Sequence, residues 1–94
     1  MNAQRQRENR LKRDYGLTPP VLDDMREAQG NACAVCRTSF EERAMNIDHN
    51  HETGAVRELL CQPCNAALGQ LGENAQVIRA LADYIEKHNN LVTV

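Results

Sequence analysis

One stretch, residues 45–68, holds most of the side chains in this sequence that could do chemistry. Asp48 and His49 are followed by His51, a turn, an apolar run and then Asn65. Carboxylate and amide oxygens are the ligands that Mg²⁺ prefers, with several waters retained. An imidazole with a pKa near neutrality can take a proton from an attacking water. The stretch therefore predicts metal-assisted hydrolysis, with Asp48 and Asn65 holding Mg²⁺ or Mn²⁺ and His49 as general base.

Four cysteines form a second group, in two Cys-x-x-Cys pairs with 24 residues between them. Two such knuckles aim four sulfurs at one point, as a tetrahedral Zn²⁺ requires. Two disulfides are the alternative. However, the chain opens with a polar, basic segment instead of the apolar run of a secretory signal, and disulfides are uncommon in reducing cytosol. We expect a cytoplasmic protein with one structural zinc per chain, bound by Cys33, Cys36, Cys61 and Cys64.

The two groups are linked, because Cys64 adjoins Asn65 and a zinc that fixes one nearly fixes the other. A structural zinc has four protein ligands and no open position, so the chemistry needs the second cation. On a phosphodiester, that cation stabilises the charge that builds on the phosphoryl and leaving oxygens. His51 lies on the same face as His49 in an extended chain and could contact the phosphate or help to hold the metal. Two alternatives are that His49 or His51 is a spare zinc ligand, and that Asp48 only caps the turn.

The same alternation rule raises a difficulty for Asp48 and His49. Neighbouring residues of a regular strand point to opposite faces, so both can face one phosphate only if the strand end twists or bulges. We expect such an irregularity at this point of the chain.

Capping signals and apolar spacing predict the elements that position these residues. We expect helices over 2–15, over 19–29 (Thr18 as N-cap, Pro19 first), from Pro63 to Gly69 or Gly72, and over 74–88, with a hairpin of strands 45–47 and 55–60. This is a mostly helical α+β fold in a single domain, 1–94: a basic N-terminal helix or arm (1–15), a zinc-stapled core (31–72) and a C-terminal helix (74–88).

The core must be small, because 94 residues include no Trp and one Phe, Phe40, which we expect to fold back as local core. In the last helix, Val77, Ile78, Leu81 and Ile85 form one apolar stripe. We predict that this stripe is core, with a partner surface as the alternative. Since no apolar run reaches the ~20 residues needed to cross a bilayer, no membrane span is expected.

The formal net charge is −2, yet residues 1–13 carry five basic side chains against only Glu8. Such asymmetry suggests an arm that reaches for the phosphates of DNA, although a solvated helix face explains it equally well. Arg57 is a further phosphate candidate because a guanidinium fork matches phosphate geometry; an exposed strand residue is the alternative. The candidate DNA-binding residues are Arg5, Arg7, Arg10, Lys12, Arg13 and Arg57.

The central pattern resembles the HNH, or ββα-metal (His-Me finger), nucleases, and more narrowly the recombination endonuclease VII family of phages. The likeness covers about two thirds of the chain: the lead-in Tyr15-Gly16-Leu17-Thr18 and Ala28-Gln29-Gly30, then Cys33-x-x-Cys36, Ile47-Asp48-His49-x-His51-x-Thr53-Gly54-x-Val56-Arg57, and Leu60-Cys61-x-x-Cys64-Asn65-x-x-Leu68-Gly69. The resemblance implies a Mg²⁺-dependent endonuclease that leaves 5′-phosphate and 3′-hydroxyl ends, with His49 as general base and Asp48 and Asn65 on the metal. It also implies action in a host cytoplasm by a phage- or bacterium-encoded protein.

Two departures from the family pattern bear on the substrate. Glu58 stands where relatives often have Gly, and could either weaken DNA binding or point to solvent. Members that resolve DNA junctions carry a further C-terminal region that builds an intertwined dimer, which bears on junction cleavage by this chain and leaves homodimerisation open.

We therefore expect a DNA endonuclease that nicks DNA or cuts branched DNA. Two competing hypotheses remain: a non-catalytic zinc-knuckle module that binds nucleic acid or protein, and a redox protein that uses its Cys-x-x-Cys pairs.

Overall fold

The computed structural model describes residues 3–92 as four helices and one two-stranded sheet. The prediction of a mostly helical α+β fold is confirmed. Residues 1 and 2 of the expected basic arm lie outside the described residues. The elements are α1 (Ala3–Tyr15), α2 (Pro19–Ala28), β1 (Met45–His49), β2 (Val56–Cys61), α3 (Gln62–Gln70) and α4 (Ala75–Val92).

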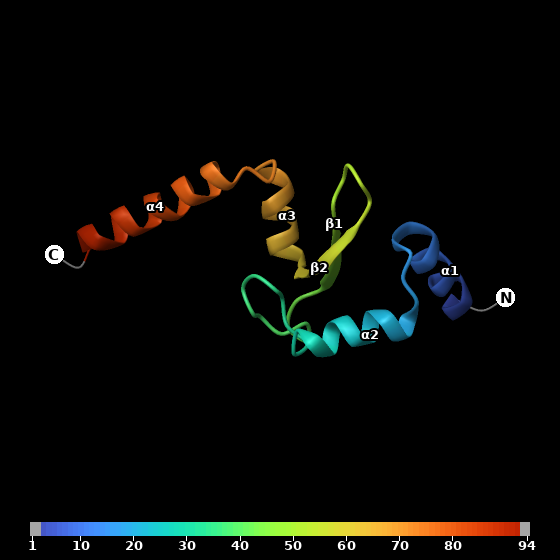
Figure 1. Ribbon diagram of the computed structural model, residues 1–94. Helices are drawn as coiled ribbons and strands as arrows, with labels where there is room; N and C mark the ends of the chain where they lie inside the picture. Colours follow the sequence, from blue (N-terminus) through green and yellow to red (C-terminus); the bar gives the residue numbers. More distant parts are fainter. Residues whose placement is uncertain (1–2, 93–94) are drawn as a thin grey trace.

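The hairpin β1–β2 occupies the middle of the molecule (Figure 1). Helix α3 lies beside it, α1 and α2 form one end, and α4 extends away at the other, so the molecule measures 62 × 29 × 21 Å. Among the described residues, no helix combines the length and the apolar character needed to cross a bilayer.

Asn50 and Gly54 close the hairpin. The Asn50 side-chain oxygen accepts hydrogen bonds from the backbone N–H groups of Glu52 (2.8 Å) and Thr53 (3.0 Å), as in an Asx turn. Gly54 has a φ of +77°, which glycine adopts without steric cost. The first strand is longer than the predicted 45–47, because pairing with β2 continues to His49.

Helix α3 begins directly after β2, with Pro63 in its first turn. The backbone N–H of Gln62 donates to Ala44 (2.9 Å), and the Asn46 side-chain amide donates to the Gln62 side chain (2.8 Å). These bonds hold the first turn of α3, which contains Cys64 and Asn65, against the beginning of β1.

Gln29, just after α2, connects that helix to the sheet. Its amide nitrogen donates to the carbonyls of Ala32 and Leu59, both at 2.9 Å, and its oxygen accepts from the N–H of Leu59 at 2.9 Å. The side chain thus pairs with the edge of β2 much as a neighbouring strand would. At the other end of α2, Thr18 occupies the N-cap position as predicted, but its side chain makes no capping hydrogen bond.

The hydrophobic core lies around the cysteines. Cys33, Leu60 and Cys61 are buried together, and Phe40 and Leu68 pack against them, so Phe40 is local core as expected.

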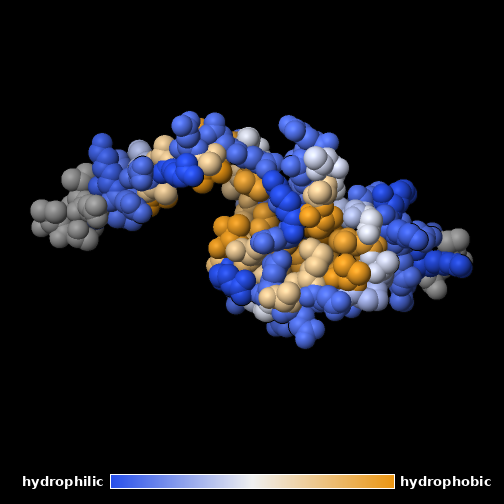
Figure 2. Space-filling view, viewed as in Figure 1, coloured by the Kyte–Doolittle hydropathy of each residue, from blue (hydrophilic) through white to orange (hydrophobic). Residues whose placement is uncertain are grey.

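The apolar stripe of α4 is not core, and that prediction was wrong. Ile78 is half-buried and lines a small apolar groove with residues of α3, but α4 turns away from the sheet immediately afterwards. Figure 2 shows apolar side chains over the middle of the molecule and along α4, and hydrophilic ones over the α1 end. The exposed fractions are 45% for Val77, 49% for Leu81, 62% for Tyr84 and 54% for Ile85.

Candidate active site and metal centre

The four cysteine sulfurs form one cluster. All four Sγ atoms lie within 4.8 Å of one another, and those of Cys36 and Cys61 are 3.6 Å apart. Zn–S bonds of about 2.3 Å in a tetrahedron place sulfurs roughly 3.8 Å apart, so the spacing fits one such ion. It is far longer than the ~2.05 Å of a disulfide bond, and all four cysteines are free. The four cysteines are therefore positioned to bind one metal ion.

The surroundings of the sulfurs are unequal. A hydrogen bond with Thr38 lowers the pKa of Cys36 to about 6, whereas burial raises the pKa of Cys64 to about 12. The Arg43 guanidinium lies 4.0 Å from the sulfurs of Cys36 and Cys61, and its bond to Cys61 raises the pKa of Arg43. A bound Zn²⁺ would hold all four sulfurs as thiolates, with Arg43 as a nearby positive charge.

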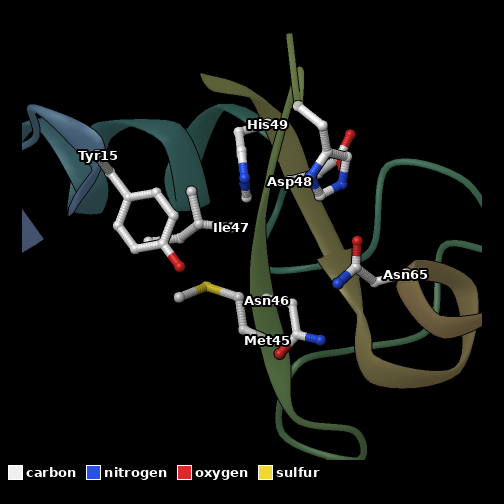
Figure 3. A pocket seen from close by; sticks show the side chains of 8 residues that line it. Tyr15, Met45, Asn46, Ile47, Asp48, His49 and Asn65 are labelled. Carbon is white, nitrogen blue, oxygen red and sulfur yellow. The ribbon is translucent and has the colours of Figure 1, made fainter. Parts of the chain in front are cut away.

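A cavity of about 420 Å³ lies beside β1, next to this cluster. Four predicted site residues line it: Asp48 and His49 from β1, His51 from the turn, and Asn65 from α3. In Figure 3, Tyr15 and the His49 ring lie on one side of β1, and Asp48 and Asn65 lie on the other. The remaining lining residues are Tyr15, Met45, Asn46 and Ile47.

The hairpin is irregular opposite Asp48, but the extra residue lies in β2 and not in the strand that carries Asp48 and His49, where it was expected. Ile47 pairs with Leu59, but His49 pairs with Val56, so Asp48 alone faces two residues of β2. This is the geometry of a β-bulge, which bends a strand and increases its twist. The bulged strand is β2, at Arg57 and Glu58, so the alternation of Asp48 and His49 along β1 is not changed by it, and the cavity that both residues line extends to both sides of β1.

His49 is half-buried between two other rings. The Tyr15 ring meets it edge-on, with centroids 5.8 Å apart and planes at 69°, and the His51 centroid is 4.6 Å away. Contacts on both sides restrict the rotation of the His49 imidazole while leaving it at the cavity.

Asp48 is buried, with 8% of its surface exposed, and Arg57 satisfies its carboxylate. Arg57 Nε donates to Oδ2 at 2.7 Å and Nη2 donates to Oδ1 at 3.0 Å. Arg57 Nη1 donates to Glu73 Oε1 at 2.8 Å. These bonds, that to Asp48 above all, raise the pKa of Arg57. The predicted phosphate contact is therefore a partly exposed strand residue whose guanidinium is held by two carboxylates.

The donor set still fits a hard divalent cation. Each carboxylate oxygen has two lone-pair directions, and the Arg57 fork uses one on each. Asp48 and Asn65 thus offer a carboxylate and an amide oxygen at one cavity, which suits Mg²⁺ or Mn²⁺ with retained waters.

The predicted DNA-binding residues of α1 lie elsewhere. Helix α1 has no buried residue, and of its side chains only Tyr15 lines the cavity. Arg13 pairs with Asp14 at 2.9 Å. Glu58, which departs from the family pattern, is exposed. The basic residues in question are Arg5, Arg7, Arg10, Lys12 and Arg13.

Two residues of the site were not predicted from the sequence. In the sequence Tyr15 is only the last residue of the helix expected over 2–15, and nothing there indicates that its ring faces His49. Glu73 lies in the turn between α3 and α4 with a φ of +56°, a conformation that the sequence does not predict for a glutamate.

Comparisons with known proteins agree with this geometry. The family model of recombination endonuclease VII matches residues 8–87. The chain is 28% identical to the ββα-Me type II restriction endonuclease Hpy99I, with a TM-score of 0.54 against its crystal structure over 87% of this chain and 48% of that one. This likeness confirms the predicted ββα-metal core.

Two phage proteins are also similar. The Gene 59 protein of Mycobacterium phage D29 is 34% identical over 82 residues, 85% of this chain and 50% of that protein. The Gene 59 protein of Mycobacterium phage L5 is 32% identical over 80 residues, 83% of this chain and 49% of that protein. The chain thus spans about half the length of the relatives that it matches.

Proposed function

The chain belongs to the recombination endonuclease VII family, and from that premise we propose that it is a metal-dependent DNA endonuclease that hydrolyses phosphodiester bonds. The observation that supports this most is that Asp48, His49 and Asn65 line one cavity beside the four-cysteine cluster. In this proposal residues 31–72 form the catalytic unit, within a single domain.

Each part of the site has a role in the proposed reaction. One Zn²⁺ on the four cysteines fixes the start of α3 and with it Asn65. When bound by Asp48 and Asn65, Mg²⁺ or Mn²⁺ supplies charge stabilisation at the phosphoryl and leaving oxygens. His51 orients the imidazole of His49 or contacts the phosphate.

His49 performs the proton transfer. Its imidazole takes a proton from the attacking water while the water oxygen bonds to phosphorus. The bond from phosphorus to the 3′ oxygen breaks, and that oxygen takes a proton from solvent, leaving a 5′-phosphate and a 3′-hydroxyl. Tyr15 and His51 pack against the His49 ring, so the imidazole has little rotational freedom left to lose when it takes part in the reaction.

Affinity for DNA comes from basic side chains in this proposal. Arg57 contacts a phosphate near the site, and α1 adds contacts without sequence preference. The likeness to proteins of mycobacteriophages supports a bacterial cytoplasm as the place of action.

We further propose that the chain acts as a homodimer, because α4 carries an uncovered apolar stripe. Cutting both strands, or both arms of a four-way junction, needs two active sites, whereas nicking needs one.

Substituting His49 tests the function. Supercoiled plasmid and a synthetic four-way junction are incubated with the zinc-loaded protein, with and without Mg²⁺ or Mn²⁺. We expect the His49→Ala variant to cleave roughly 10²–10⁴-fold more slowly than the native protein. His88→Ala is the matched control, since it removes a histidine from exposed α4.

Unchanged cleavage by His49→Ala with the native zinc content would refute the proposed general base. Binding of DNA by the native protein without cleavage under any of these conditions would favour the zinc-knuckle binding module instead.

A further inference from the structure

The ion pair between Arg57 and Asp48 has a third member. Two Arg57 nitrogens hold Asp48 at 2.7 and 3.0 Å, and the third holds Glu73 at 2.8 Å. The Asp48 side chain is 10% exposed, while those of Arg57 and Glu73 are 36% and 33% exposed. One face of the triad is therefore buried at the cavity and the other is open to solvent.

Two irregular pieces of backbone create this arrangement. The bulge in the hairpin sets Arg57 across from Asp48. The turn after α3 holds Glu73 at a φ of +56°, and its N–H donates to the carbonyl of Leu68 at 3.0 Å. A left-handed backbone is uncommon for a residue other than glycine, and such outliers gather at functional sites.

The triad presents a conflict of charges. Arg57 already neutralises the carboxylate that a divalent cation would use, and a guanidinium this close repels a second cation. A DNA phosphate resolves the conflict, because a guanidinium fork binds phosphate as well as it binds carboxylate. Since Arg57 is partly exposed, its guanidinium can turn from Asp48 to a phosphate while Glu73 retains one nitrogen.

We propose that Arg57 is a resident counter-ion of Asp48 that makes cation binding depend on DNA. In the free protein it occupies the carboxylate, and it turns to a phosphate of bound DNA when a divalent cation takes its place. The inference rests on the proposed function, since it takes Asp48 as a cation ligand. Its consequence is a site that binds its catalytic cation weakly until substrate arrives.

The opposite role for Arg57 is that of a positioning residue, which orients Asp48 and strengthens the site. Partners of metal-binding carboxylates commonly act in this way, and their removal weakens metal binding. The two roles predict changes of opposite sign in cation affinity when Arg57 is neutralised.

The deciding measurement is a calorimetric titration of the zinc-loaded, DNA-free protein with Mn²⁺. We expect Arg57→Gln to bind Mn²⁺ on the order of tenfold more tightly than the native chain. Arg79→Gln, on exposed α4, removes the same charge far along the chain and should leave the affinity unchanged. An Arg57→Gln protein that binds Mn²⁺ no more tightly than the native chain overturns the proposal.

A second measurement tests the link to DNA in a His49→Ala background, where cleavage is suppressed. Fluorescence anisotropy gives the affinity for a short duplex with and without Mn²⁺. Because coupling between two ligands is reciprocal, Mn²⁺ should tighten DNA binding several-fold when Arg57 is present and much less in Arg57→Gln. Equal coupling in the two proteins overturns the proposal.

Asp48→Asn separates this inference from the proposed function. If Asp48→Asn binds Mn²⁺ as the native chain does, the cation site itself is misplaced and both proposals fail. If Asp48→Asn loses Mn²⁺ while Arg57→Gln binds it with native affinity, the cation site stands and only the counter-ion role fails.

Discussion

Strand β2 ends in three consecutive buried residues, Leu59 to Cys61, whereas α4 has one half-buried side chain, Ile78, among residues 75–89. Both segments are apolar in sequence. The end of β2 is buried because the four-cysteine cluster holds the first Cys-x-x-Cys pair and α3 against it. Helix α4 follows the turn at Gly72 and Glu73, meets the body at Ile78 and extends away from it (Figure 1).

The difference shows what apolar spacing can and cannot determine. A stripe at helical spacing establishes that a helix has an apolar face, but it does not say what covers that face. Most helical stability in proteins comes from packing of an apolar face, so the uncovered stripe of α4 is open to a partner. In the centre of the molecule, the four cysteine sulfurs determine which segments pack together, because one metal ion can bind only sulfurs that meet at one point.

Removal of a metal ligand should have the largest effect and should be confined to the centre. We expect Cys61→Ser to lose its metal and its cooperative unfolding transition, since structural zinc contributes about 10–16 kcal/mol to the folding of zinc-finger peptides. The measurements are zinc content and thermal melting. Asp83→Ser, on the side of α4 opposite the apolar stripe, is the contrasting change and should melt like the native chain. If Cys61→Ser melts normally with one zinc bound, the centre does not depend on the cluster.

A charge on the α4 stripe should have the next largest effect, on self-association instead of folding. Burying an Ile contributes about 1.5–3 kcal/mol, and a symmetric dimer loses this twice, so Ile85→Glu should weaken the dimer at least roughly a hundredfold. Light scattering coupled to size exclusion measures the change, with Gln76→Glu, on the opposite side of the helix, as control. A native chain that is monomeric at all concentrations would refute the dimer.

Much of the centre could be predicted from the sequence because its signals are local. Cys-x-x-Cys spacing predicted the sulfur cluster, and Pro63 predicted the start of α3. The alternation of side chains predicted an irregular strand at Asp48 and His49, whereas the extra residue lies in the facing strand, β2.

Contacts between distant segments could not be predicted in this way. The bonds of Gln29 to β2 join residues 30 apart, and the bond of Arg57 to Glu73 joins residues 16 apart. Each depends on where whole elements come together, which neither spacing nor composition determines. The α4 stripe was misjudged for the same reason.

The two end helices offer a smaller and sharper contrast, because both are exposed but differ in charge. We expect replacement of Arg10 and Lys12 by Gln in α1 to weaken DNA binding and to reduce the slope of log K against log salt by about 0.9 for each lost phosphate contact. Replacement of Arg79 and Lys87 in α4 is the matched change. Equal effects of the two pairs in salt titrations of DNA binding would show that α1 is only a solvated helix.

The smallest effect concerns a charge in the centre itself. Arg43 lies 4.0 Å from the sulfurs of Cys36 and Cys61, and four thiolates around one Zn²⁺ leave two negative charges that this guanidinium partly offsets. Because Arg43 is exposed to solvent, its removal should change the rate of zinc loss only about threefold. A chromogenic chelator would follow that rate in Arg43→Gln, with Arg43→Lys retaining the charge. If zinc is lost faster from Arg43→Gln and at nearly the native rate from Arg43→Lys, the effect of Arg43 is one of charge. Equally fast loss from both variants shows that the geometry of the guanidinium matters.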